Sequence, residues 1–421
     1  MKGDFAYRDE RLHCESTPLA EVAAEYGTPL YVYSRRSILQ RLATLDAAFA
    51  PLDRLMAYSV KANGNLSILR LVAGAGAGAD IVSGGELFRA LRAGIPADRI
   101  VFSGVGKTRL ELRSAVEAGI LCFNVESEGE LRALSEVAVE TGRTAPFALR
   151  INPDIESPTP HAYTRTGHRS TKFGVPSEDA PRLYRLGREL PGLRPVGVDA
   201  HIGSQIVEPE PYEQSLRHLL ERVDELVADG IELELLDLGG GFGLAYDRNA
   251  DPEPEAFGQR IVPLLRDRGL RLVLEPGRYV IGHAGVLITR VIYVKAMGAK
   301  TFVITDAGMN DLLRPSHYSS WHRVEPVERT GRRPESVRGV DIVGPICESG
   351  DFLALDREMP MPRPGDLLAI HTVGAYGFSM ASTYNARPRP AEVLVDDDRP
   401  RLIRRRETYH DLVRGEEELL E

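Results

Sequence analysis

The chain has 421 residues, of which 43% are hydrophobic, and a formal net charge of −9 at pH 7. This length and composition predict a soluble globular protein with room for two domains. The negative charge argues against a nucleic-acid-binding surface, because such surfaces gather lysine and arginine.

Eight short apolar segments recur, with helical patterns between most of them. They span residues 55–60, 79–82, 100–102, 120–124, 147–151, 196–201, 233–238 and 270–275. Between them, stretches such as 212–228 repeat apolar residues at the helical period. Alternating strands and helices predict a parallel sheet. Eight such units in roughly 230 residues match a (β/α)8 TIM-type barrel, with an open, doubly wound sheet as the alternative.

The pattern changes after residue 280. Residues 286–296, 301–305, 339–343, 367–372 and 391–395 read as strands, and turns punctuate them, which predicts a mostly antiparallel C-terminal β domain. Residues 1–30 are expected to join this domain, because 29–33 is an apolar, strand-like run ahead of the barrel. We therefore predict a cofactor-binding barrel at 31–282. A β-sandwich or barrel-like domain from 1–30 and 283–421 would complete the active site.

Lys61 lies directly after the first predicted strand, and residues 62–65 break that strand. A lysine at the mouth of a strand, flanked by small residues, suits a Schiff base with an aldehyde cofactor. Partial burial beside other charges favours the loss of its proton that this chemistry needs. A surface lysine in a loop is the alternative.

Polar residues also mark other predicted strands at the carboxyl rim, where TIM-type barrels carry their chemistry. With Lys61 they are Asp80 in the second strand, Arg150 ending the fifth, residues 201–205 ending the sixth, 239–243 ending the seventh and Glu275 ending the eighth. Six such positions on one rim predict a shared site.

The glycine run Gly239, Gly240 and Gly241 suits a phosphate, because backbone N–H groups approach a phosphate closely only where no Cβ intervenes. The loops after strands seven and eight are also the usual phosphate site of such barrels. A plain tight turn is the alternative. The run does not fit the dinucleotide fingerprint, which needs Gly-x-Gly-x-x-Gly ahead of a paired ribose acid.

Glu275 ends an apolar strand, where a carboxylate is costly to bury without a cationic partner. A protonated pyridine nitrogen would be such a partner, and the ion pair would keep the ring electron-withdrawing. A structural pair with Arg278 or Arg150 is the alternative. His201 suits a position flat against a cofactor ring, and a satisfied structural histidine is the competing interpretation.

A second polar cluster falls in the predicted β domain and includes Arg314, Tyr318, Cys347, Glu348 and Tyr376. Cys347 lies beside Glu348 in a loop bracketed by glycine and proline, which indicates a working thiol. Free cysteine also serves as a small core hydrophobe. Tyr376 suits a hydrogen-bond donor to phosphate, with core packing as the alternative.

Several site classes are not expected. No apolar run approaches the roughly 20 residues of a membrane helix, and the first residues lack the apolar stretch of a signal peptide. The three cysteines form neither a disulfide framework nor a metal-ligand spacing. We therefore expect a cytoplasmic protein with no membrane or nucleic-acid partner and no bound metal.

Seven strings together carry a family resemblance, at residues 58–63, 78–87, 201–205, 275–278, 306–314, 344–351 and 374–385. Over about residues 29–406 the chain resembles the fold-type III pyridoxal-phosphate decarboxylases, and most closely the diaminopimelate decarboxylases. The resemblance implies an alanine-racemase-like barrel plus a β domain, and pyridoxal 5'-phosphate as cofactor. It also implies a head-to-tail homodimer with shared active sites and a small amino-acid substrate.

The resemblance also implies a role for each matching residue. Lys61 would hold the cofactor as a Schiff base, His201 would stack on its ring, Glu275 would pair with its pyridine nitrogen, and Asp80 and Arg150 would belong to its site. The phosphate region would be bound by Ser204, Gly239, Gly240, Gly241, Gly277, Arg278 and Tyr376. The substrate would be held by Arg278, Arg314, Tyr318, Glu348 and Tyr376. Cys347 and Glu348 would come from the partner subunit, with Cys347 as the proton donor.

The activity implied is decarboxylation of meso-2,6-diaminopimelate to L-lysine and carbon dioxide. Two arginines and a tyrosine suit the distal carboxylate of this substrate, which lysine and ornithine lack. A related decarboxylase for another amino acid or a carrier-linked glutamyl group is the alternative, and a non-catalytic regulatory paralogue is a third hypothesis. The string 161–163 reads His-Ala-Tyr where the family usually has His-Pro-Tyr.

Overall fold

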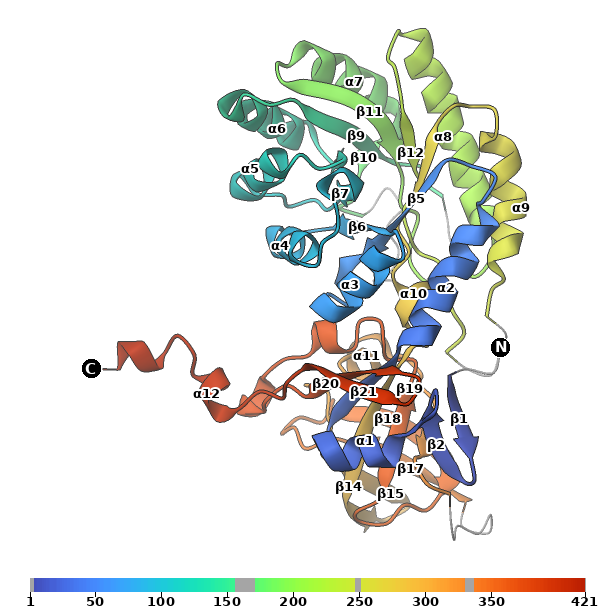
Figure 1. Ribbon diagram of the computed structural model, residues 1–421, viewed down its shortest axis with the longest axis vertical. Helices are drawn as coiled ribbons and strands as arrows, with labels where there is room; N and C mark the ends of the chain where they lie inside the picture. The colour runs from blue at the N-terminus through green and yellow to red at the C-terminus, as the bar shows by residue number, and fades with distance from the viewer. Residues whose placement is uncertain (1–3, 156–170, 247–250, 330–336, 421) are drawn as a thin grey trace. The chain divides into compact units, whose positions relative to one another are not determined.

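The computed structural model describes residues 4–155, 171–246, 251–329 and 337–420 (Figure 1). The string 161–163 noted above lies outside these ranges. The chain forms two compact units. One comprises residues 41–245 and 250–279, and the other comprises 1–40, 246–249 and 280–421.

The first of these units is a closed parallel barrel, as predicted. In the described ranges, eight strands follow one another around it, and the last pairs with the first. They are β5 (Arg54–Ser59), β6 (Gly78–Ile81), β7 (Ile100–Phe102), β8 (Cys122–Val125), β9 (Ala145–Asn152), β11 (Leu193–Asp199), β12 (Leu235–Asp237) and β13 (Arg271–Leu274). A two-residue strand, β10 (Val175–Pro176), pairs with β9 from outside the ring.

Helices connect the barrel strands, and local capping explains where several of them begin. They are α3 (Leu66–Gly74), α4 (Gly84–Arg92), α5 (Arg109–Ala118), α6 (Glu128–Thr141), α7 (Ala180–Glu189), α8 (Glu210–Ala228) and α9 (Pro254–Leu265). Side chains of Asn65, Ser83, Thr108 and Ser127 accept the free N–H groups of the first turns of α3 to α6. The predicted apolar stripe of α8 is buried except at Val227, which is 55% exposed and lies on the outer face.

The barrel interior changes character along its axis. A cluster of buried apolar residues includes Ala57, Val101, Leu235 and Val273. Because side chains on one face of a strand recur every second residue, the next inward positions are those two residues later. There the chain carries polar residues, namely Ser59, Ser103, Asp237 and Glu275. Apolar packing therefore closes the barrel on one side of a polar layer at the carboxyl ends of the strands.

The other unit is a mostly antiparallel β domain, also as predicted. Its main sheet has the order β18-β17-β15-β14-β4-β20-β21, with β19 pairing to β14 and β16. The strands are β4 (Leu30–Ser34), β14 (Gly285–Met297), β15 (Lys300–Thr305), β16 (Val324–Pro326), β17 (Val337–Val343), β18 (Phe352–Pro360), β19 (Leu367–His371), β20 (Ala391–Asp396) and β21 (Arg399–Arg404). The pairs β15–β17 and β4–β20 are parallel.

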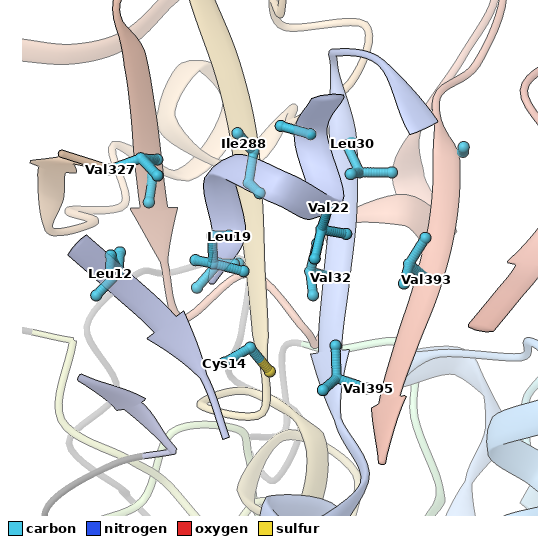
Figure 2. Close-up of a cluster of buried hydrophobic side chains, with 14 residues drawn as sticks. Leu12, Cys14, Leu19, Val22, Leu30, Val32, Ile288, Val327, Val393 and Val395 are labelled. Carbon is cyan, nitrogen blue, oxygen red and sulfur yellow. The ribbon is translucent and has the colours of Figure 1, made fainter. Parts of the chain in front are cut away.

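The N-terminal segment belongs to this β unit. It contributes β1 (Phe5–Arg8), β2 (Arg11–Cys14), β3 (Thr17–Pro18), α1 (Leu19–Tyr26) and β4, drawn in blue beside orange and red strands in Figure 1. Figure 2 shows Leu19 and Val22 of α1 packing with Val32 of β4, Ile288 of β14 and Val393 of β20. The unit runs to residue 40 and includes β4, which pairs with β14 and β20.

Short helices complete the β unit at α11 (Arg314–Tyr318) and α12 (Tyr409–Leu412), while α2 (Arg35–Ala48) and α10 (Arg278–Ile281) cross the boundary between the units. The structure also contains β18 and β21, which the sequence pattern did not reveal. In β18 the apolar residues 352–355 run directly into the charged residues 356–358, and in β21 arginines interrupt the apolar positions, so neither segment shows a sustained strand pattern. In the described residues, no helix combines the length and the apolarity needed to cross a membrane.

Candidate active site

Lys61 lies in a single 3-10 turn, η1 (Val60–Ala62), directly after β5. Its Nζ donates a hydrogen bond of 2.7 Å to Oδ2 of Asp80, and its side chain is 32% exposed. Asp80 is fully buried, and the same oxygen accepts the hydroxyl of Ser59 at 2.8 Å. A buried carboxylate thus orients an amine that remains open to solvent, as an amine that attacks a carbonyl group must be.

Glu275 follows β13 and is 3% exposed. The hydroxyl of Ser103 donates to its Oε1 at 3.1 Å. Burial, and then the negative charge of Asp80, raise the pKa of Glu275 to about 7, while the charges of Lys61 and Arg150 oppose this rise. A buried acid with a raised pKa ionises more readily when a cationic partner lies beside it. Glu275 is therefore suited to pair with the protonated pyridine nitrogen of a cofactor ring.

His201 lies beside this acid, after β11. Its Nδ1 is 3.8 Å from Oε2 of Glu275 and accepts the backbone N–H of Gly240 at 3.1 Å. Burial, followed by the charges of Arg150 and Lys61, lowers the pKa of His201 well below its ordinary value. A ring nitrogen that accepts an N–H carries no proton, so this imidazole is neutral and makes no ion pair with Glu275.

The glycine run follows β12 and turns through left-handed backbone at Gly239 (φ 67°) and Gly241 (φ 98°). A Cβ on Gly240 would lie 2.1 Å from the carbonyl oxygen of Glu275. The N–H of Gly239 donates to Oδ1 of Asp237 at 2.9 Å, and that of Gly240 donates to His201. At Gly239 and Gly240, internal packing therefore accounts for the glycine, and both N–H groups are already engaged within the barrel.

The loops after β11 and β13 meet beside this run. Arg278 is 7% exposed, and its NH2 group donates to the hydroxyl of Ser204 at 3.0 Å. A Cβ on Gly277 would lie 2.9 Å from Cβ of Ser59, so the chain before Arg278 packs closely against the end of β5. Arg278 and Ser204 are thereby held next to the loop that carries Lys61.

Arg150 lies near the end of β9, 6% exposed, and its NH1 group forms an ion pair of 3.0 Å with Oε1 of Glu126. Glu126 also accepts the backbone N–H groups of Gly104 and Gly174, both at 2.9 Å. One buried carboxylate therefore joins Arg150 to the loop after β7 and to the residues preceding β10.

The remaining predicted site residues belong to the β unit. Arg314 begins α11, is 5% exposed, and its guanidinium lies 5.6 Å from the ring of Tyr318. Its NH2 group donates to the hydroxyl of Ser320 at 3.1 Å. Tyr376 has left-handed backbone, with φ 57°, and is half-buried after β19.

Cys347 and Glu348 lie exposed in the loop between β17 and β18. The carboxylate of Asp351 shapes this loop by accepting the N–H groups of Ile346 and Met309, each at 2.6 Å. The N–H of Cys347 donates to Oδ1 of Asn385 at 2.9 Å. Cys347 is therefore presented on an ordered loop, whereas Cys14 and Cys122 are buried.

Sequence reasoning missed several polar residues of the barrel interior, namely Ser59, Ser103, Asn124, Glu126, Asp199 and Asp237. Each lies within one residue of the carboxyl end of a barrel strand, so the rule used for Lys61 and Glu275 could have found them. Asp199, Asp237 and Glu275 form what we term the acid cluster. One carboxylate oxygen from each lies within 4.8 Å of the other two. The expectation of no bound metal stays a prediction.

Comparison with known proteins places these residues in context. Residues 35–282 match the family described as pyridoxal-dependent decarboxylase, pyridoxal binding domain. A diaminopimelate decarboxylase of Aquifex aeolicus is 47% identical over 408 residues, which are 97% of this chain and 96% of that protein. One from Neisseria meningitidis serogroup B is 48% identical over 405 residues, or 96% and 97%. The crystal structure of diaminopimelate decarboxylase from Helicobacter pylori complexed with L-lysine is 41% identical, with a TM-score of 0.91, covering 96% of this chain and 100% of that one.

Proposed function

This chain belongs to the diaminopimelate decarboxylase family of pyridoxal-dependent enzymes, and from that premise we propose that it converts meso-2,6-diaminopimelate to L-lysine and carbon dioxide. The observation that supports the proposal is that Lys61 and Glu275 lie at the same rim of the barrel, at the carboxyl ends of its strands. Ser59 joins them, since its hydroxyl lies 2.8 Å from Oδ2 of Asp80, the partner of Lys61, and 2.9 Å from the carbonyl oxygen of Glu275. Pyridoxal 5'-phosphate, when bound, supplies an electron sink for the carbanion left by carbon dioxide.

Lys61 is the residue that binds the cofactor covalently. Asp80 holds its Nζ at 2.7 Å and, being buried, keeps the amine pointed at one position. The same amine would be available to release the product. The 32% exposure of the Lys61 side chain supports this role, because both exchanges need access to the amine.

With the cofactor bound, Glu275 would pair with its pyridine nitrogen and His201 would lie against its ring. The neutral imidazole suits this position, because a second positive charge beside the ring would oppose its protonation. Ser204, Gly241, Gly277, Arg278 and Tyr376 would hold the phosphate region. Gly239 and Gly240, whose N–H groups donate to Asp237 and His201, would shape the turn that presents Gly241. Arg150 and Asp80 complete the charges around the site.

The distal end of the substrate is recognised by Arg278, Arg314, Tyr318 and Glu348. Two guanidinium groups and a phenol match a carboxylate, and the carboxylate of Glu348 matches an ammonium group. Cys347 donates the proton that replaces carbon dioxide. Its exposure supports a role in a neighbouring subunit, within a head-to-tail homodimer whose active sites are shared. The three free thiols fit a reducing, cytoplasmic compartment.

A substrate panel tests the function. Purified protein loaded with pyridoxal phosphate is given meso-diaminopimelate, lysine, ornithine and glutamate in parallel, and products and carbon dioxide are measured. Lysine should form from diaminopimelate alone. Turnover of another substrate without lysine formation would instead support the related-decarboxylase alternative, and a loaded protein with no turnover would support a regulatory paralogue. Lys61→Ala should abolish the visible absorbance of the bound cofactor, and an unchanged spectrum would contradict the role of Lys61.

A further inference from the structure

The acid cluster contains two residues to which the proposed function gives no part, Asp199 and Asp237. The register pairs Asp199 with Asp237 on β11 and β12, and the chain of β13 places Glu275 beside them. The three residues are 1%, 0% and 3% exposed, and one oxygen of each lies within 4.8 Å of the others. Three carboxylates at this separation, away from water, are not all ionised together unless cations match them.

The positively charged groups around the acid cluster do not balance the charge of three ionised carboxylates. In the described ranges, the groups that act on its members are Asp80 on β6, Glu126 after β8, Arg150 on β9 and Lys61 after β5, besides the neutral groups His201, Cys122 and Tyr184. Lys61 is paired with Asp80, and Arg150 is paired with Glu126. Both cations are thus already matched by acids outside the acid cluster.

Hydrogen-bond donors distinguish the two aspartates. Asp237 accepts the N–H of Gly239 at 2.9 Å on Oδ1 and the amide of Asn124 at 3.1 Å on Oδ2. Oδ1 of Asp199 is buried with no hydrogen-bond partner among the described residues. Hydrogen-bond donors stabilise the charged form of a carboxylate. Asp237, which accepts two such bonds, is therefore ionised more readily, and Asp199 holds a proton more readily.

We propose that Asp199 and Asp237 are positioning residues for Glu275, with the proton of the pair on Asp199, so that the negative charge facing the cofactor ring is that of Glu275. This inference rests on the proposed function, in which Glu275 pairs with the pyridine nitrogen. Gly239 connects Asp237 and Glu275. Its backbone N–H donates to Asp237, and its carbonyl oxygen accepts the backbone N–H of Glu275 at 2.9 Å. Burial raises the pKa of both Asp199 and Asp237, which accords with this assignment.

The proton itself is the first thing to measure. Infrared spectra of the cofactor-free and loaded protein, carrying isotope-labelled aspartate, report the carbonyl stretch of a protonated aspartate near neutral pH. The wild-type spectrum should contain this band. Asp311, whose pKa is raised to about 7, contributes to the band as well, so the spectra are compared as differences from Asp311→Asn. In that background the remaining band should disappear on adding Asp199→Asn and persist on adding Asp237→Asn or the exposed control Asp267→Asn. Absence of the remaining band before any further substitution, or its persistence with Asp199→Asn, would overturn the assignment even if one variant did not fold.

Cofactor binding gives the second readout. Asparagine mimics a protonated aspartate in shape and charge, so Asp199→Asn should keep the cofactor dissociation constant within about twofold of wild type. Asp237→Asn should raise it by about tenfold, equivalent to one pKa unit. A tenfold loss in Asp199→Asn with Asp237→Asn unchanged would overturn the proposal. Glu275→Gln tests the proposed function separately: if it left the cofactor absorbance and affinity unchanged, the pairing with the ring would fail, whatever the infrared band showed.

Discussion

The Nζ atom of Lys61 lies 2.7 Å from Oδ2 of Asp80, a carboxylate that solvent does not reach. The same negative charge acts on Glu275, where it is the largest cause of the raised pKa after burial. Asp80 therefore couples the amine at one edge of the site to the acid at another. This coupling makes the charge state of the site measurable in the cofactor-free protein.

Stability of the cofactor-free protein should fall as pH rises through the range from about 4.5 to about 7. The pKa of Glu275 is raised from 4.5 to about 7, so the folded state holds a proton that the unfolded chain has released. Such a group favours folding at low pH and loses about 3 kcal/mol of that advantage by pH 7. Glu275→Gln should remove the part of the pH-dependent loss of stability that Glu275 causes, as measured by thermal unfolding at each pH. Glu86 and Asp311, with pKa values also raised to about 7, will leave a residual slope, and so will Asp199 and Asp237, whose pKa values burial raises.

Asp80→Asn should lower the pKa of Glu275, because it removes a negative charge that opposes ionisation. The Glu275-dependent loss of stability should then finish at a lower pH than in the wild type and be smaller. Comparing the pH profile of Asp80→Asn with that of Asp80→Asn/Glu275→Gln isolates the effect. If Glu275→Gln changed the pH profile of stability by the same amount with Asp80 present as with Asp80→Asn, Asp80 would not act on Glu275.

Glu126→Gln should destabilise the barrel by about 3 kcal/mol, since it leaves the buried guanidinium of Arg150 without its anion. Denaturant unfolding measures the change. Glu128→Gln is the matched control, because its ion pairs with Arg132 and Arg182 are exposed and screened by solvent, so their loss should destabilise the protein much less. Equal effects of the two substitutions would mean that burial does not set the importance of the Glu126 pair.

Gly240→Ala should cost about 1–3 kcal/mol and weaken cofactor binding, because the new Cβ would lie 2.1 Å from the carbonyl oxygen of Glu275. Gly129→Ala in α6, where no atom lies within 4 Å of the new Cβ, should be neutral or slightly stabilising. Thermal unfolding and cofactor titration of both variants check this expectation. A fully stable Gly240→Ala protein with normal affinity would contradict the packing described.

Asn385→Ala should lower kcat more than it raises KM, because the loop of Cys347 loses the acceptor for its N–H. Asn385 also has left-handed backbone (φ 54°), so alanine adds strain, and Asn385→Asp is the variant that keeps both an acceptor and tolerance of this conformation. Alkylation offers a readout independent of turnover, since Cys347 is the exposed thiol. Its alkylation rate should change by about threefold or more in Asn385→Ala, and unchanged alkylation and turnover would rule out a positioning role.

Most of the barrel could be predicted from periodicity, because each buried strand is a short apolar run between amphipathic helices. The eight predicted segments overlap the eight barrel strands in order. In the β unit the same approach missed β18 and β21, in which charged residues interrupt the apolar positions. The pairing of β4 with β14 and β20 is a contact between distant parts of the chain, which no local pattern reveals.

The amino-acid sequence by itself determined the fold class, the family and the residue types at the rim, since these depend on local patterns and on strings of adjacent residues. The tertiary structure alone decided which acids share an environment. Asp199, Asp237 and Glu275 lie on three strands and come together only when the barrel closes. Burial and mutual repulsion then set their protonation, and neither quantity exists until the strands are side by side.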